Sequence, residues 1–196
     1  MIRAVFTLLI AAAVAGANAQ TTWVPDKAHS EVSFTVQYLV ISKVTGKFNN
    51  FDFTLDQTTD DLSGSTLKAT VDVASIDTDN EKRDNHLRSD DFLNAEKFPT
   101  LVFVSTAFEK AGENRYRVPG NLTIRNITRP VVLDVHYNGT VQDPWGNTKA
   151  GFTATTTINR FDFDVKWDKT NAVGDLVVGK DIEITLLVQA VKQAGS

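Results

Sequence analysis

Apolar and polar residues alternate along most of the chain beyond residue 20. Val32, Phe34 and Val36 occupy every second position of one run, and polar residues lie between them. A period of two is typical of a β-strand that buries one face. The alternation predicts about nine strands, over residues 32–40, 51–55, 67–73, 101–108, 122–124, 131–137, 152–158, 161–165 and 182–188.

One segment departs from this alternation. Thr78 and Glu81 are spaced as a capping box, which predicts a short polar helix over residues 79–88. Pro99 closes the segment. Between the predicted strands, clusters of turn-forming residues indicate turns at 63–65, 119–121, 138–139 and 143–147.

Such a chain forms either a β-sandwich or a closed antiparallel barrel. A closed barrel of about eight strands leaves no exposed edge, and it is the architecture we expect, with one short helical insertion. An eight-stranded barrel has an interior that side chains fill or that holds one small ligand. Periodicity alone does not distinguish a barrel with a packed core from a barrel with a ligand cavity.

The first residues carry the marks of an export signal. Arg3 precedes an apolar run over residues 4–15, which is too short to span a bilayer core of ~30 Å. Residues 17–19 read Ala-Asn-Ala, a small-residue cleavage site. We expect cleavage after Ala19, a single mature domain over residues 20–196 and a periplasmic location. No later segment has 18 consecutive apolar residues, so we expect no stable membrane insertion.

Composition argues against several classes of function. The chain has no Cys, which excludes disulfides, thiolate zinc sites and cysteine nucleophiles. Its net charge is −4 and it has no Lys/Arg cluster, which argues against nucleic-acid binding. Its three His residues lack the spacing of a metal site, and no G-x-S-x-G nucleophile motif occurs. We therefore expect no metal, no catalytic residues and no enzymatic activity.

Several ordered blocks of the chain resemble the YceI-like family of bacterial periplasmic proteins. The first block runs from Asp26 to Phe48 (DKAHSEVSFTVQYLVISKVTGKF), and the most specific block covers residues 75–106. The blocks 120–139 (GNLTIRNITRPVVLDVHYNG) and 144–163 (PWGNTKAGFTATTTINRFDF) follow at consistent spacing. One departure is Asp164, because family members usually have Gly after the INR-x-DF sequence.

The resemblance implies a lipocalin-like barrel that sequesters a long-chain apolar ligand for transport or storage. The ligand classes implied are a polyisoprenoid, an isoprenoid quinone or a fatty amide, with no other cofactor. The resemblance is also compatible with a homodimer. Two alternatives stay open: an enzyme acting on a lipid-like substrate, and a stress or interaction protein with an incidental cavity. An enzyme turns its ligand over, whereas a carrier releases it unchanged.

Aromatic and apolar residues of the alternating faces are the candidates for the wall of such a cavity. Each methylene group that a ligand buries contributes ~0.8 kcal/mol, so tail burial should dominate the affinity. The candidate wall residues are Phe34, Val36, Tyr38, Phe48, Phe51, Phe53, Phe92, Phe98, Phe103, Phe161 and Phe163.

Basic residues near the predicted helix and near the last predicted turn are candidates for binding a polar head group. The guanidinium of Arg offers a planar set of donors for a phosphate or carbonyl head. The alternative is structural: a solvated helix face with an Asp84–Arg88 pair, and an ion pair between Arg160 and Asp162. The candidates are Arg83, His86, Arg88 and Arg160.

Overall fold

The computed structural model describes residues 20–59 and 61–193, so the predicted export signal lies outside the described residues. The described chain forms one sheet of twelve antiparallel strands, one α-helix and four short 3-10 helices. The strands are β1 (Thr21–Pro25), β2 (Glu31–Tyr38), β3 (Ser42–Phe48), β4 (Phe51–Gln57), β5 (Thr66–Asp72), β6 (Ile76–Asp77), β7 (Thr100–Ser105), β8 (Glu109–Gly112), β9 (Arg115–Ile124), β10 (Ile127–Gln142), β11 (Thr148–Asn159) and β12 (Val178–Lys192). The helices are α1 (Glu81–Arg88), η1 (Lys27–His29), η2 (Leu62–Gly64), η3 (Val73–Ser75) and η4 (Arg160–Phe163).

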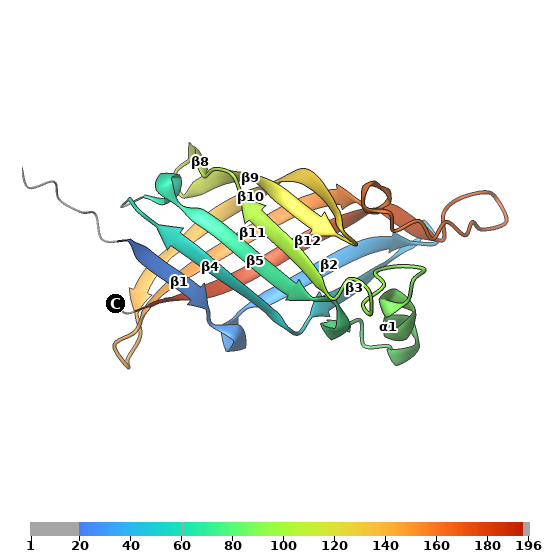
Figure 1. Cartoon of the computed structure of the whole chain (residues 1–196), viewed down its shortest axis with the longest axis horizontal. Coiled ribbons are helices and arrows are strands. Elements are labelled where there is room, and N and C mark those ends of the chain that lie inside the picture. Colours follow the sequence, from blue (N-terminus) through green and yellow to red (C-terminus); the bar gives the residue numbers. More distant parts are fainter. Residues whose placement is uncertain (1–19, 60, 194–196) are drawn as a thin grey trace, which may run out of the picture.

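The sheet closes on itself as an elongated barrel (Figure 1). β12 pairs with β2 and then, near its end, with β1, where Lys192 lies opposite Trp23. β1 also pairs with β4, so the order β1-β4-β5-β7-β9-β10-β11-β12 returns to its start. The predicted eight-stranded antiparallel barrel with one short helix is thereby confirmed. α1 lies at one end of the barrel and β8 at the other (Figure 1).

The buried side chains form two clusters along the barrel. The larger one, the main cluster, runs from the β8 end into the middle, and includes Trp23, Phe103, Tyr116 and Phe152. The smaller one, the helix-end cluster, lies toward α1 and consists of Phe92, Ile124, Ile158, Phe163 and Val165. Alternation explains both, because the inward positions of each strand are apolar and the outward positions face solvent.

Two predicted turns lie inside strands instead. Gly120 belongs to β9, and Gly139 belongs to β10. A Cβ atom on Gly120 would lie 2.3 Å from the ring of Phe103, so glycine makes room for that ring. Gly139 has a φ of 114° where the register between β10 and β11 shifts. Gly120 therefore permits a close ring contact and Gly139 lies at a β-bulge. In the sequence, glycines in these two roles look the same as glycines in turns.

The predicted strand over residues 161–165 is also wrong, because η4 occupies most of it. The side chain of Asn159 accepts a backbone hydrogen bond and caps the first turn of this 3-10 helix. Asp164 ends η4 with a left-handed φ of 62°. Asp tolerates that conformation better than most residues. The glycine that the resemblance leads us to expect at this position would adopt the same conformation without strain.

The helix is slightly shorter than predicted, and its cap differs. It begins at Glu81, and Asn80, rather than Thr78, supplies the capping oxygen. Thr78 donates its hydroxyl hydrogen bond to the buried carboxylate of Asp84 instead. The predicted capping box is therefore wrong, because Thr78 serves a buried contact between α1 and the segment that precedes it.

Candidate functional site

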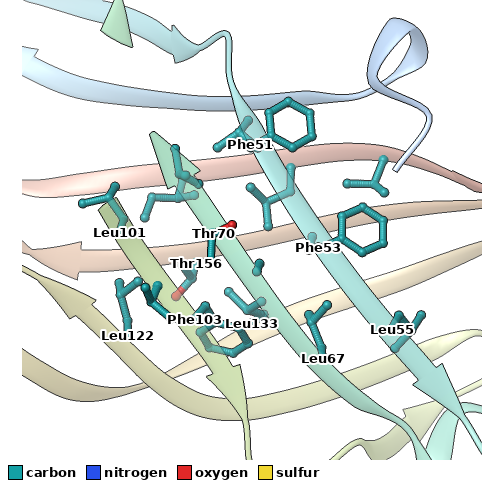
Figure 2. A pocket seen from close by; sticks show the side chains of 18 of the residues that line it. Phe51, Phe53, Leu55, Leu67, Thr70, Leu101, Phe103, Leu122, Leu133 and Thr156 are labelled. Carbon is teal, nitrogen blue, oxygen red and sulfur yellow. The ribbon is translucent and has the colours of Figure 1, made fainter. Parts of the chain in front are cut away.

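A cavity of about 180 Å³ lies inside the barrel. Its lining includes residues from β2, β4, β5, β7, β9, β10, β11 and β12. Figure 2 shows Phe53, Leu67 and Phe103 projecting from three neighbouring strands into one space. A cavity to which so many strands contribute is a property of the whole barrel rather than of one loop.

Small side chains at inward positions leave this space open. Ala69 on β5 lies opposite Phe53 on one side and Phe103 on the other. Ala154 on β11 and Thr156 on the same face also line the cavity. Because a larger side chain at Ala69 or Ala154 would occupy the cavity, these two positions control its volume.

The wall of the cavity is almost wholly apolar. Among the described residues, Asp52, Thr70 and Thr156 are the lining residues with polar side chains. The side chain of Asp52 is 61% exposed and pairs with Lys27 across 3.4 Å, so its charge faces solvent. A wall of this kind favours hydrocarbon, because a polar group buried there without a hydrogen bond costs free energy.

Three of the eleven candidate wall residues line the cavity, namely Phe51, Phe53 and Phe103. Phe34 and Phe48 contact each other instead, on the neighbouring strands β2 and β3, with ring centroids 5.7 Å apart. These two rings occupy the barrel beyond the cavity lining.

The remaining candidates for the wall lie outside the cavity lining as well. Phe92 and Phe163 are buried in the helix-end cluster. The rings of Phe98 and Phe161 each lie under a guanidinium, and that of Arg160 is 4.3 Å from the Phe161 ring centroid. Val36 is buried on β2, and Tyr38 near the end of that strand is exposed.

Aliphatic residues make up most of the wall, and the sequence prediction left them out. Their signal was present, because they occupy the alternating positions of the predicted strands. The aliphatic lining residues include Leu55, Leu67, Leu101, Leu122, Val131, Leu133, Val135, Ile184, Leu186 and Val188.

Arg83 and Arg88 bind the chain's own backbone and side chains. Arg83 donates through Nε to the Thr78 hydroxyl and through Nη2 to the Thr78 carbonyl, both at 2.7 Å. Arg88 donates to the carbonyls of Ala74 and Ile76 at 2.9 and 2.8 Å. Both arginines thus attach α1 to the segment before it, rather than forming the solvated face that was the alternative.

Arg160 is the most deeply buried charged side chain described, with 3% of its surface exposed. Its guanidinium donates to the backbone carbonyls of Val165, Val178 and Gly179 over 2.6–3.0 Å. Burial lowers the pKa of Arg160 from its usual value. These contacts join η4 to the start of β12, and within the described residues no ion pair links Arg160 to Asp162.

His86 packs against aromatic rings at the helix end. Its ring meets those of Phe92 and Trp167 edge-on, at centroid distances of 5.0 and 5.8 Å. Its Nε2 atom lies 2.8 Å from a carboxylate oxygen of Asp91. None of the four head-group candidates lines the cavity.

In the part of the chain that the structure describes, no group of three His, Asp or Glu side chains is arranged to hold a metal ion. No helix over residues 20–59 and 61–193 has the length and apolar content that crossing a membrane requires.

Comparison with known proteins matches residues 23–190 to the YceI-like domain. The chain belongs to the YceI-like family. One relative of this YceI-like chain is a UPF0312 protein of Shewanella sp. W3-18-1, 38% identical over 168 residues. That match covers 85% of the present chain and 84% of the relative.

Solved structures share the barrel of this YceI-like chain. The YceI protein of Campylobacter jejuni is 32% identical with a TM-score of 0.69, over 86% of this chain and 96% of the other. A polyisoprenoid-binding domain from Saccharophagus degradans is 13% identical, with a TM-score of 0.61, over 89% of this chain and 99% of the other. The second likeness concerns the fold alone.

Proposed function

We propose that this YceI-like barrel binds a long-chain apolar ligand and carries or stores it unchanged. The single observation that carries the proposal is the apolar cavity inside the barrel, with Asp52 turned out to solvent. The polyisoprenoid-binding domain of Saccharophagus degradans, which has the same fold, supports a ligand of this kind. A polyisoprenoid, an isoprenoid quinone and a fatty amide all supply a tail of suitable chemistry.

A carrier accounts for the cavity better than an enzyme does. Catalysis by acid and base requires ionisable groups that face the substrate. The ionisable lining side chain in the described chain is Asp52, which pairs with Lys27 at the surface. We therefore expect the ligand to leave the protein chemically unchanged, which mass spectrometry of ligand recovered after incubation tests.

The proposed location is the periplasm. Its support is the sequence of residues 1–19, with Arg3, a short apolar run and a cleavage site at Ala19. Mass measurement of the protein recovered from its own cells tests this directly. A mature chain beginning at Gln20 is the expected result, and a full-length chain in the cytoplasm contradicts it.

Titration with ligands of increasing tail length tests the binding itself. Each added methylene contributes up to ~0.8 kcal/mol, so affinity should rise several-fold for every two carbons until the cavity is filled. Ala154→Trp fills the cavity and should weaken binding at least about tenfold. Thr155→Trp is the matched control, because the neighbouring Thr155 is exposed on the outer face of β11.

Two outcomes contradict the proposed function. One is an affinity that does not depend on tail length. The other is an Ala154→Trp variant that folds, by its circular dichroism spectrum, and binds as tightly as the Thr155→Trp control.

A further inference from the structure

A ligand with a polar head cannot satisfy that head inside the barrel cavity. The hydroxyls of Thr70 and Thr156 are the polar groups that the described wall offers besides Asp52, which faces solvent. A carbonyl or carboxylate left there without adequate partners would pay a desolvation cost. The head must therefore lie at one of the two ends of the barrel.

The α1 end offers little to a head group. The guanidinium groups of Arg83, Arg88 and Arg160 donate to backbone carbonyls of the chain itself. Between these arginines and the cavity lies the helix-end cluster, with Phe92 and Phe163 buried in it. This end is closed by apolar rings and by arginines that donate to the chain itself. Arg125 does so through Nη1 and Nη2, and its Nε is buried without a partner among the described residues.

The β8 end is built differently, with a second pocket of about 340 Å³ that we name the β8-end pocket. Its floor is aromatic, formed by Trp23, Tyr116 and Phe152, and polar side chains including Lys110 and Asn114 surround it. Phe152 lines both this pocket and the barrel cavity, so the two spaces adjoin at that ring.

We propose that the β8-end pocket binds the polar head of the ligand while the tail extends past Phe152 toward α1. This inference rests on the proposed function, because it requires a tail in the barrel cavity. It names a site for the head group at the end opposite the arginines that sequence reasoning selected.

The exposed polar groups of the pocket indicate the chemistry of the head. Among the described residues, neither the ammonium of Lys110 nor the side-chain amide of Asn114 has a hydrogen bond or ion pair within the protein. The ammonium of Lys110 only donates and the amide of Asn114 both donates and accepts, so together they suit a head that accepts hydrogen bonds. Asp61, also in the lining, already accepts from Ser63 and Thr59. Its negative charge opposes that of an anion, which favours a carbonyl-bearing head with at most one negative charge.

Two tryptophans mark the two ends and make the orientation measurable. Trp23 lines the β8-end pocket. Trp167 packs against the helix-end cluster, alongside Leu101 and Leu122, which line the cavity. The third tryptophan, Trp145, is exposed and can be replaced by Phe to remove its fluorescence.

Quenching by a brominated ligand tests the orientation. The variant W145F/W167F retains only Trp23, and W23F/W145F retains only Trp167. Octadecanoic acid brominated beside the carboxylate should quench Trp23 more strongly than the acid brominated at its terminal methyl. The opposite order at Trp23, or strong quenching of Trp167 by the bromine beside the carboxylate, overturns the proposal.

A second experiment separates the head-group site from the proposed function. Lys110→Ala should weaken binding of octadecanoic acid about tenfold, the usual scale of a lost charged hydrogen bond, and leave binding of octadecane within about twofold. Lys43→Ala is the control, because Lys43 is an exposed lysine paired with Glu183 away from the pocket. Equal loss for acid and hydrocarbon, or no loss for either, overturns the head-group site. A wild-type protein that binds neither overturns the proposed function as well.

Discussion

The two ends of the barrel are held together by different chemistry. At the α1 end, arginine side chains donate to backbone carbonyls, and aromatic rings cover the interior. At the β8 end, Asp26, just after β1, pairs with Lys149 on β11, and a polar pocket adjoins the cavity. Guanidinium groups that donate to carbonyls therefore characterise one end, whereas a lysine–carboxylate pair, which is lost when the carboxylate is protonated, characterises the other.

This difference distinguishes basic residues that stabilise the fold from basic residues whose donors remain available. An arginine such as Arg160 directs three of its five donors to the chain's own carbonyls and lies buried outside the cavity lining. A lysine such as Lys110, whose ammonium is exposed and has no hydrogen bond or ion pair in the described chain, keeps its donors available, and its charge helps to lower the pKa of Asp61. Arginine side chains thus stabilise the α1 end, whereas the ammonium of Lys110 at the β8 end keeps its donors exposed.

The largest expected effect is on the α1 end. Arg160→Ala leaves the carbonyls of Val165, Val178 and Gly179 without their donor in a buried site, which should lower the free energy of unfolding by about 3–5 kcal/mol. Urea unfolding followed by circular dichroism measures the change. Lys43→Ala, in an exposed pair, should change it by less than about 0.5 kcal/mol. A loss below about 1 kcal/mol for Arg160→Ala would show that the carbonyls find other partners.

Acid should weaken the β8 end. The hydrogen bond from Lys149 is the main cause that lowers the pKa of Asp26 from 3.8 to about 2. A depressed carboxyl pKa contributes stability above the unfolded value, and that contribution is lost as the pH falls from about 4 toward 2. Once solvent screening is allowed for, we expect a loss on the order of 1 kcal/mol from this group.

Asp26→Asn isolates this contribution from the other carboxylates. Urea unfolding of both proteins across the range from pH 5 to pH 2, about the span over which such a group titrates, should give a flatter dependence for the variant. Parallel curves for the two proteins would mean that the Asp26–Lys149 pair does not stabilise the β8 end.

The smallest effect concerns the ring contacts of the helix end. His86→Ala removes two edge-on contacts, to Phe92 and Trp167, and should cost about 1 kcal/mol of unfolding free energy. His86→Phe keeps the ring and loses only the contact with Asp91, so it should recover most of that loss. If both variants lose the same amount, the carboxylate contact rather than the rings stabilises this end.

The barrel was predictable because each of its strands is half-buried, which a period of two reports directly. The interruption of the first barrel strand by η1 was not, because Lys27–His29 has no distinctive pattern. The turns predicted at Gly120 and Gly139 are wrong. Sequence alone does not distinguish a glycine under an aromatic ring or at a β-bulge from a glycine in a turn.

The cavity was less predictable than the fold. Whether an inward residue lines a space or packs against a neighbour depends on register across strands distant in sequence, as with Ala69 between Phe53 and Phe103. The structural role of Arg160 was hidden for a similar reason. Two of its carbonyl partners, at Val178 and Gly179, lie 18 and 19 residues further along the chain.

The central claim is that the barrel holds a long-chain apolar ligand, and the most direct measurement is the mass spectrum of an organic extract. The protein would be purified from its own cells without detergent, alongside the cavity-filled variant Ala154→Trp. The account predicts a long-chain species at about one per chain from the wild-type protein, strongly reduced in the variant. Extracts that are indistinguishable, or a wild-type protein that yields no such species and takes up none on titration, would contradict it.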